Sequence, residues 1–176
     1  MDHLKGAPVR KLMIATVALL AIALPASAMT ASAAKKKPVV KKPIAFLATY
    51  KGTATTQSSG NVVTIVANGA GAGTAAVLGA GKITGNGTGD SSKQPCVPFT
   101  GTGVMSGAKG TLTFKVNPGS SGCGDQAGQL FSVSGKATIV KGTGKLAKAK
   151  GLLRMTGTFD RTSGAFTVKF TGTVPA

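Results

Sequence analysis

Apolar and polar residues alternate along several short segments of the C-terminal three quarters of the chain. In residues 111–116 (TLTFKV) every second residue is apolar, and residues 165–170 (AFTVKF) repeat the pattern. A period of two is typical of β-strands that bury one face. Composition and alternation predict further strands at residues 46–54, 61–67, 129–135, 136–140 and 152–159.

Turn residues separate these segments. Asn68-Gly69 suits a two-residue hairpin turn, and residues 160–164 (DRTSG) suit a longer hairpin loop. Strands that recur about every 8–12 residues are typical of a sandwich or a barrel, and glycine beside so many of them is typical of tight barrel bends. Residues 69–89 leave two interpretations open, two short glycine-rich strands or a loop. The sequence therefore predicts one all-β domain at residues 44–176, an antiparallel β-barrel of about eight strands.

The N-terminus has the pattern of a signal peptide. Lys5, Arg10 and Lys11 give the first eleven residues a positive charge. Residues 12–24 are apolar and uncharged, and residues 26–28 (Ala-Ser-Ala) are small. The apolar run is shorter than the about 20 residues that a membrane-spanning helix needs. We expect cleavage after residue 28, with residue 33 as the alternative site. The mature protein should be secreted, either extracellular or associated with the cell envelope.

A basic tail follows at residues 29–43. Lysine and proline dominate it, and neither the repelling charges nor the prolines favour a helix. The whole chain has a formal net charge of +17, so we expect salt-dependent attraction to an anionic envelope polymer or lipid surface. Export and the scarcity of exposed aromatic residues argue against nucleic acid as a partner. The tail lysines are Lys35, Lys36, Lys37, Lys41 and Lys42.

Cys96 and Cys123 are the two cysteines of the chain. An even number of cysteines in an exported protein predicts a disulfide, which would contribute about 3–4 kcal/mol. The bond would bring the segments of Asp90 and Asp125 together. We favour the interpretation that both aspartates cap turns beside the disulfide; the alternative is an acidic rim or a weak calcium site.

Few residues can perform acid–base chemistry. The only histidine, His3, lies in the signal peptide, so the mature chain lacks the usual catalytic triads and most zinc sites. We expect no catalytic residue, metal or cofactor. Tyr50 and Arg154 are candidates for a side chain in the barrel lumen or for an anion contact, and each is also explained by packing or surface exposure. The lumen or rim candidates are Tyr50, Asp90, Asp125 and Arg154.

The segment GTGKLAKAKG, residues 142–151, has three interpretations. It formally matches a dinucleotide-binding loop, but Gly151 would end the required helix after about two turns. As a membrane-active helix it would offer Leu146 as its only large apolar side chain. We favour a turn that closes one end of the barrel, in which Leu146 and Ala149 share one face and Gly151 is a left-handed stop. This structural turn comprises Gly142, Gly144, Leu146, Ala149 and Gly151.

The same ten residues resemble, in spacing, the G-T-G-K-F-x-x-A-x-G signature of plant dirigent proteins. The chain is also similar to the wider allene-oxide-cyclase-like group of β-barrels and its bacterial secreted relatives, whose closing strands residues 153–174 resemble. Lys141 stands where a glycine is usual, and Leu146 replaces the aromatic residue. The resemblance implies an antiparallel barrel with an apolar lumen, often trimeric. It transfers none of the family's catalytic residues to positions of this chain.

These features predict a secreted, cationic β-barrel without evident catalytic machinery, which is attached to the envelope or binds a small apolar ligand. One alternative is a barrel enzyme or auxiliary protein of the allene oxide cyclase or dirigent type that acts on an apolar substrate. Another is a surface adhesion protein. The sequence leaves open whether the protein forms a homo-oligomer.

Overall fold

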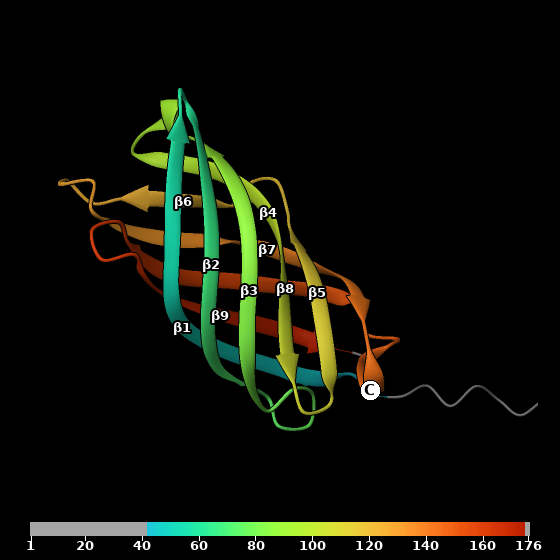
Figure 1. Ribbon diagram of the computed structural model, residues 1–176. Helices are drawn as coiled ribbons and strands as arrows, with labels where there is room; N and C mark the ends of the chain where they lie inside the picture. Colours follow the sequence, from blue (N-terminus) through green and yellow to red (C-terminus); the bar gives the residue numbers. More distant parts are fainter. Residues whose placement is uncertain (1–41, 175–176) are drawn as a thin grey trace, which may run out of the picture. The chain divides into compact units, whose positions relative to one another are not determined.

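The computed structural model describes residues 42–174, which form an all-β domain (Figure 1). The signal peptide and the tail up to residue 41 lie outside the described residues. The strands are β1 (Ile44–Ser59), β2 (Val62–Gly73), β3 (Ala80–Asp90), β4 (Cys96–Gly107), β5 (Gly110–Val116), β6 (Ser121–Gly124), β7 (Leu130–Gly142), β8 (Gly151–Asp160) and β9 (Ala165–Val174). Two single turns of 3-10 helix, η1 (Ser91–Lys93) and η2 (Gly144–Leu146), interrupt them.

The strands close into an eight-stranded antiparallel barrel. Neighbours pair in the order β1, β2, β3, β4, β5, β7, β8 and β9, and β9 pairs with β1 to complete the ring. The short strand β6 also pairs with β4 and β7, beyond the end of β5, and so extends the wall at that position. The predicted antiparallel barrel of about eight strands is confirmed.

Because the strands alternate in direction, the connections gather at two ends of the barrel (Figure 1). We call the end where β1 begins and β9 ends the closed end; loop 74–79, hairpin 107–110 and segment 143–150 lie there. We call the opposite end the mouth; hairpins 59–62 and 160–165, η1 and loop 125–129 lie there.

Side chains fill the half of the barrel nearest the closed end. The interior positions of this half alternate with exposed ones along each strand. In β8, for example, buried Leu153 and Met155 alternate with exposed Leu152 and Arg154. This is the pleat that the alternating sequence predicted. The side chains that are fully buried include Tyr50, Leu78, Met105, Leu112, Leu153 and Phe170.

Segment 143–150 closes this end of the barrel. Leu146 and Ala149 are 7% and 5% exposed and join the core, whereas the three lysines of the segment are exposed. The helical part is only the single turn η2, so no helix needs a left-handed stop at its end. Gly144 has the left-handed φ of 58°, and Gly151 (φ 152°) instead begins β8. The three exposed lysines, called the turn lysines below, are Lys145, Lys148 and Lys150.

The prediction of a hairpin turn at Asn68-Gly69 is wrong. Both residues lie inside β2, where they pair with Thr53 and Gly52 of β1. A Cβ atom on Gly69 would lie 2.6 Å from the carbonyl oxygen of Lys51, so glycine is required by the close approach of two strands and not by a turn. The hairpin between β1 and β2 turns instead at Gly60, whose φ is 56°.

The uncertain region at residues 69–89 contains strands on both sides of loop 74–79. Inward glycines alternate with outward polar residues along β3, so that Gly85, Gly87 and Gly89 face the lumen. A Cβ on Gly101 of the neighbouring β4 would clash with the carbonyl oxygen of Asn86. Strands β3 and β4 therefore approach each other closely because many of their inward positions are glycine.

Candidate ligand cavity

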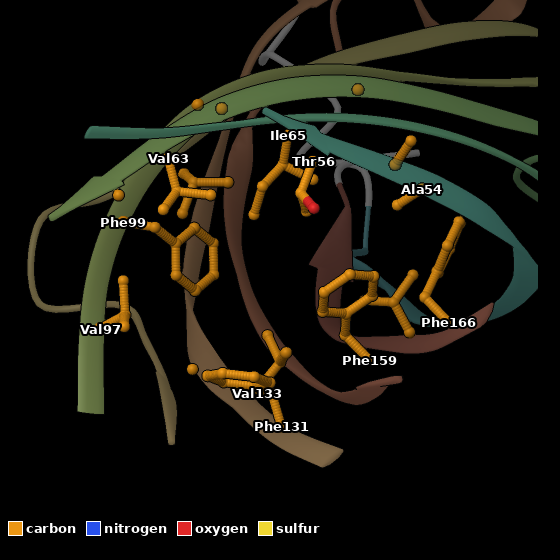
Figure 2. A pocket seen from close by; sticks show the side chains of 18 of the residues that line it. Ala54, Thr56, Val63, Ile65, Val97, Phe99, Phe131, Val133, Phe159 and Phe166 are labelled. Carbon is orange, nitrogen blue, oxygen red and sulfur yellow. The ribbon is translucent and has the colours of Figure 1, made fainter. Parts of the chain in front are cut away.

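A cavity of about 420 Å³ occupies the half of the barrel nearest the mouth (Figure 2). Every strand of the closed ring contributes to its lining, together with Gly122 of β6. Its floor consists of core residues, among them Phe114, Met155 and Phe170. The cavity therefore ends inside the barrel and does not continue to the closed end.

Aromatic rings form much of the wall. Six of the seven phenylalanines of the chain line the cavity. Figure 2 shows Phe99, Phe131, Phe159 and Phe166 projecting into it from β4, β7, β8 and β9. The rings of Phe131 and Phe159 lie 6.3 Å apart, centroid to centroid, and are tilted by 41°. Such tilted rings offer faces and edges to which a flat apolar molecule can pack.

Part of the wall formed by β3 and β4 carries no side chains. Gly85, Gly87 and Gly89 of β3 and Gly101 of β4 line the cavity with backbone alone. The missing side chains leave space in front of the aromatic rings. Because the two strands approach each other closely, a Cβ atom at these positions would crowd atoms of the neighbouring strand, which favours glycine there. The sequence thus creates the cavity by placing glycine on one side of the lumen and phenylalanine elsewhere around it.

The polar groups of the lining are almost all uncharged. Hydroxyl and amide side chains come from Thr56 and Ser58 of β1, from Ser91 of η1 and from Gln94. Arg161, in the hairpin between β8 and β9, is the only lining residue with an ionisable side chain. None of the carboxylates in residues 42–174 is part of the lining.

The predicted lumen candidate Tyr50 lies in the filled half of the barrel and not in the cavity lining. Its side chain is 0% exposed, and its hydroxyl has no hydrogen-bond partner within the described part of the chain. Burial raises the pKa of Tyr50 from 10.0 to about 12, because the phenolate would lose its hydration. Tyr50 thus contacts the core, and a ligand in the cavity would not meet it.

Asp90 and Asp125 lie at the mouth, where each carboxylate holds its own turn. Asp90 accepts hydrogen bonds from the hydroxyl (2.6 Å) and backbone N–H (3.0 Å) of Ser92, which lower the pKa of Asp90. Asp125 accepts from the backbone N–H groups of Gln129 (2.9 Å) and Leu130 (3.3 Å). Both act as turn caps, and residues 42–174 contain no group of three or more His, Cys, Asp or Glu side chains that could hold a metal.

Cys96 and Cys123 form the predicted disulfide, which joins β4 to β6 at the mouth. A disulfide indicates that the domain folds in a non-reducing compartment. Among residues 42–174 no helix is long and apolar enough to cross a membrane.

Arg154 points away from the lumen. It lies in the middle of β8, is exposed, and alternates with buried Leu153 and Met155. Sequence reasoning proposed this arginine for the lumen and overlooked Arg161, which lies in a segment assigned only to a turn. The only signal for Arg161 is its place in the hairpin loop that follows a strand with inward-facing aromatic residues.

Comparison of the chain with protein-family models, with curated proteins and with solved structures found no match.

Proposed function

We propose that this protein is a secreted carrier that binds one small apolar molecule in the mouth half of its barrel. The observation that supports this function is the cavity itself, which has a closed floor and an aromatic wall. Its volume of about 420 Å³ lies within the range of about 300–1,000 Å³ that is usual for small-molecule sites. The glycine positions of β3 and β4 leave space beside the phenylalanines, which favours a flat ligand with one or more rings.

The lining favours binding over acid–base catalysis. General acids and bases are usually His, Asp, Glu, Lys, Tyr or Cys side chains, and the lining formed by residues 42–174 contains none of them. A barrel enzyme of the cyclase or dirigent type would have to act through shape and through uncharged hydroxyl and amide groups of the lining, such as those of Thr56, Ser58 and Gln94. Conversion of a bound apolar substrate into a new product would support that alternative.

Two neighbouring residues of β2 provide a matched test of the cavity. Ile65 lines the cavity and Val66, the next residue, is 47% exposed on the outer face. Ile65→Trp should fill part of the cavity, whereas Val66→Trp adds the same side chain outside the barrel. The probe is N-phenyl-1-naphthylamine, an uncharged two-ring dye whose fluorescence rises in apolar surroundings.

We expect the wild-type protein and Val66→Trp to bind one equivalent of the dye, and Ile65→Trp to bind at least about tenfold more weakly. Thermal melting checks that both variants are folded. Equal binding by the two folded variants would contradict the proposal, as would a wild-type protein that does not bind the dye.

We also propose that the carrier is held at an anionic envelope polymer by its basic tail. The distribution of charge on the domain supports this arrangement. The carboxylates of residues 42–174 lie at the mouth, at Asp90, Asp125 and Asp160. The closed end, where β1 follows the tail, is rich in lysine. Its lysines include Lys42, Lys109, Lys141 and the turn lysines. An anionic polymer would attract the closed end and leave the mouth free to exchange ligand.

A further inference from the structure

We infer that the ligand carries one acidic group, a carboxylate or an equivalent anion, which pairs with Arg161 at the mouth while its apolar body fills the cavity. This inference rests on the proposed function, because it concerns the occupant of the same cavity. It identifies the chemical class of the ligand as a flat, ring-bearing organic acid.

The position of Arg161 supports an anion at the mouth. The residue directly follows β8, whose Phe159 projects into the cavity, and it begins the hairpin that leads to Phe166 on β9. Its backbone N–H donates a hydrogen bond of 2.9 Å to the carbonyl oxygen of Gln129. This bond ties the hairpin to the loop before β7, so the backbone of Arg161 is held at the mouth of the cavity, whose lining includes this residue.

The carboxylates at the mouth are not placed in the cavity to pair with this guanidinium. Asp160, next to Arg161, accepts hydrogen bonds from the backbone N–H groups of Thr162 (2.8 Å) and Ser163 (3.2 Å). The carboxylates of Asp90 and Asp125 are bound to their own turns in the same way. Asp90, Asp125 and Asp160 are all outside the cavity lining, whereas Arg161 is part of it.

The rest of the lining distinguishes an acid from a base. A cationic ligand would find no carboxylate in the cavity and would be repelled by Arg161. A strongly polar ligand would lose its hydration against the phenylalanines without gaining hydrogen bonds from them. A guanidinium binds a carboxylate through two parallel N–H···O bonds, and the hydroxyl group of Ser58, which also lines the cavity, can donate a further one. The cavity thus combines an apolar body with a single positive end.

Three naphthalene derivatives that share one ring system test the inference: 2-naphthoate, 2-naphthalenemethanol and 2-naphthylmethylamine. Isothermal titration at pH 7.5 and low salt should show that the wild-type protein binds the carboxylate about threefold to tenfold more tightly than the alcohol. The cationic amine should bind most weakly. Added salt should reduce the preference for the carboxylate.

Arg161→Gln should weaken binding of the carboxylate until its affinity equals that of the alcohol. Arg154→Gln is the matched control, because it removes the same charge from the outer face of β8. It should preserve the preference, which excludes an effect of net charge. Both arginines are exposed, so both variants should melt like the wild type.

The outcomes separate this inference from the proposed function. If alcohol and carboxylate bind the wild-type protein equally, or if Arg161→Gln retains the preference, the acidic group is refuted and the apolar carrier stands. If none of the three compounds binds, or if Ile65→Trp leaves their binding unchanged, the proposed function itself fails.

Discussion

Removal of the Tyr50 hydroxyl should stabilise this protein. Tyr50 lies on β1, between Gly71 of β2 and Val168 of β9, and its side chain is fully buried. Its hydroxyl has no partner within residues 42–174. A buried hydroxyl without a partner has lost its hydrogen bonds to water and gained nothing in return. Tyr50→Phe keeps the ring in place and removes only this oxygen.

The expected gain follows from the cost of an unsatisfied buried polar group, which is about 1–3 kcal/mol. The small space that the oxygen leaves reduces the gain, because the surrounding side chains lose a few contacts. We therefore expect the free energy of unfolding to rise by about 1–2 kcal/mol. For a domain of this size, each 1 kcal/mol corresponds to a rise of about 3–6 °C in the melting temperature.

Urea denaturation followed by far-ultraviolet circular dichroism is the suitable assay. The chain has one tyrosine and no tryptophan, so the variant has no useful intrinsic fluorescence. The disulfide must be intact in both proteins, and an equal dependence on urea would show that the unfolded states are comparable. A loss of 1 kcal/mol or more in Tyr50→Phe would refute the reasoning, since it would mean that the hydroxyl makes a stabilising hydrogen bond.

Three further predictions concern pH, the closed end and the tail. Since burial raises the pKa of Tyr50 from 10.0 to about 12, ionisation of this residue should leave the free energy of unfolding unchanged below pH 10 and lower it as the pH rises from 10 to 12; tyrosinate absorbance of the folded protein that titrates near pH 10 would contradict this. Leu146→Asp should lower the free energy of unfolding, measured in urea, by about 2–4 kcal/mol, because it buries a charge in the core. Replacement of the three turn lysines by glutamine should change this free energy by less than about 1 kcal/mol. If the lysine replacement were the more destabilising of the two, the segment would not be a structural plug. Deletion of residues 35–42 should weaken retention on an immobilised anionic polymer and flatten its salt dependence, and unchanged retention would place the attachment site on the barrel.

The sequence predicted the strands whose inner face carries large apolar side chains. Segments 111–116 and 165–170 lie in β5 and β9, and the two neighbouring segments at 129–140 form the single strand β7. The sequence pattern does not predict strand β4, and it leaves β3 open between a strand and a loop. In both strands the inward position of the alternation is often glycine, so a search for alternating apolar residues misses them. Glycine at every second position, as at Gly85, Gly87 and Gly89, was the signal that could have revealed β3.

The candidate site was less predictable than the fold. The phenylalanines could be assigned to inward positions of strands from the alternation alone. The cavity could not be predicted, because its volume depends on which inward residues of distant strands face one another across the lumen. Tyr50 and Phe166 lie on adjacent strands and both face inward, yet only Phe166 reaches the cavity. Arg154 points outward because it alternates with buried Leu153 and Met155 along β8, whereas Arg161 lies in the hairpin loop after β8, where strand alternation says nothing of its direction.

The most direct test of the central claim is to map where an apolar ligand binds. Methyl signals of Ile and Val can be followed by nuclear magnetic resonance while 2-naphthalenemethanol is added to the folded protein. Our account predicts shifts at the methyl groups that line the cavity and none at those on the outer face. The cavity methyls include those of Val63, Ile65, Val97 and Val133, and the outer ones include those of Val62, Val66 and Val140. Shifts confined to the outer set, or no shifts at a saturating concentration, would contradict a carrier that binds its ligand inside the barrel.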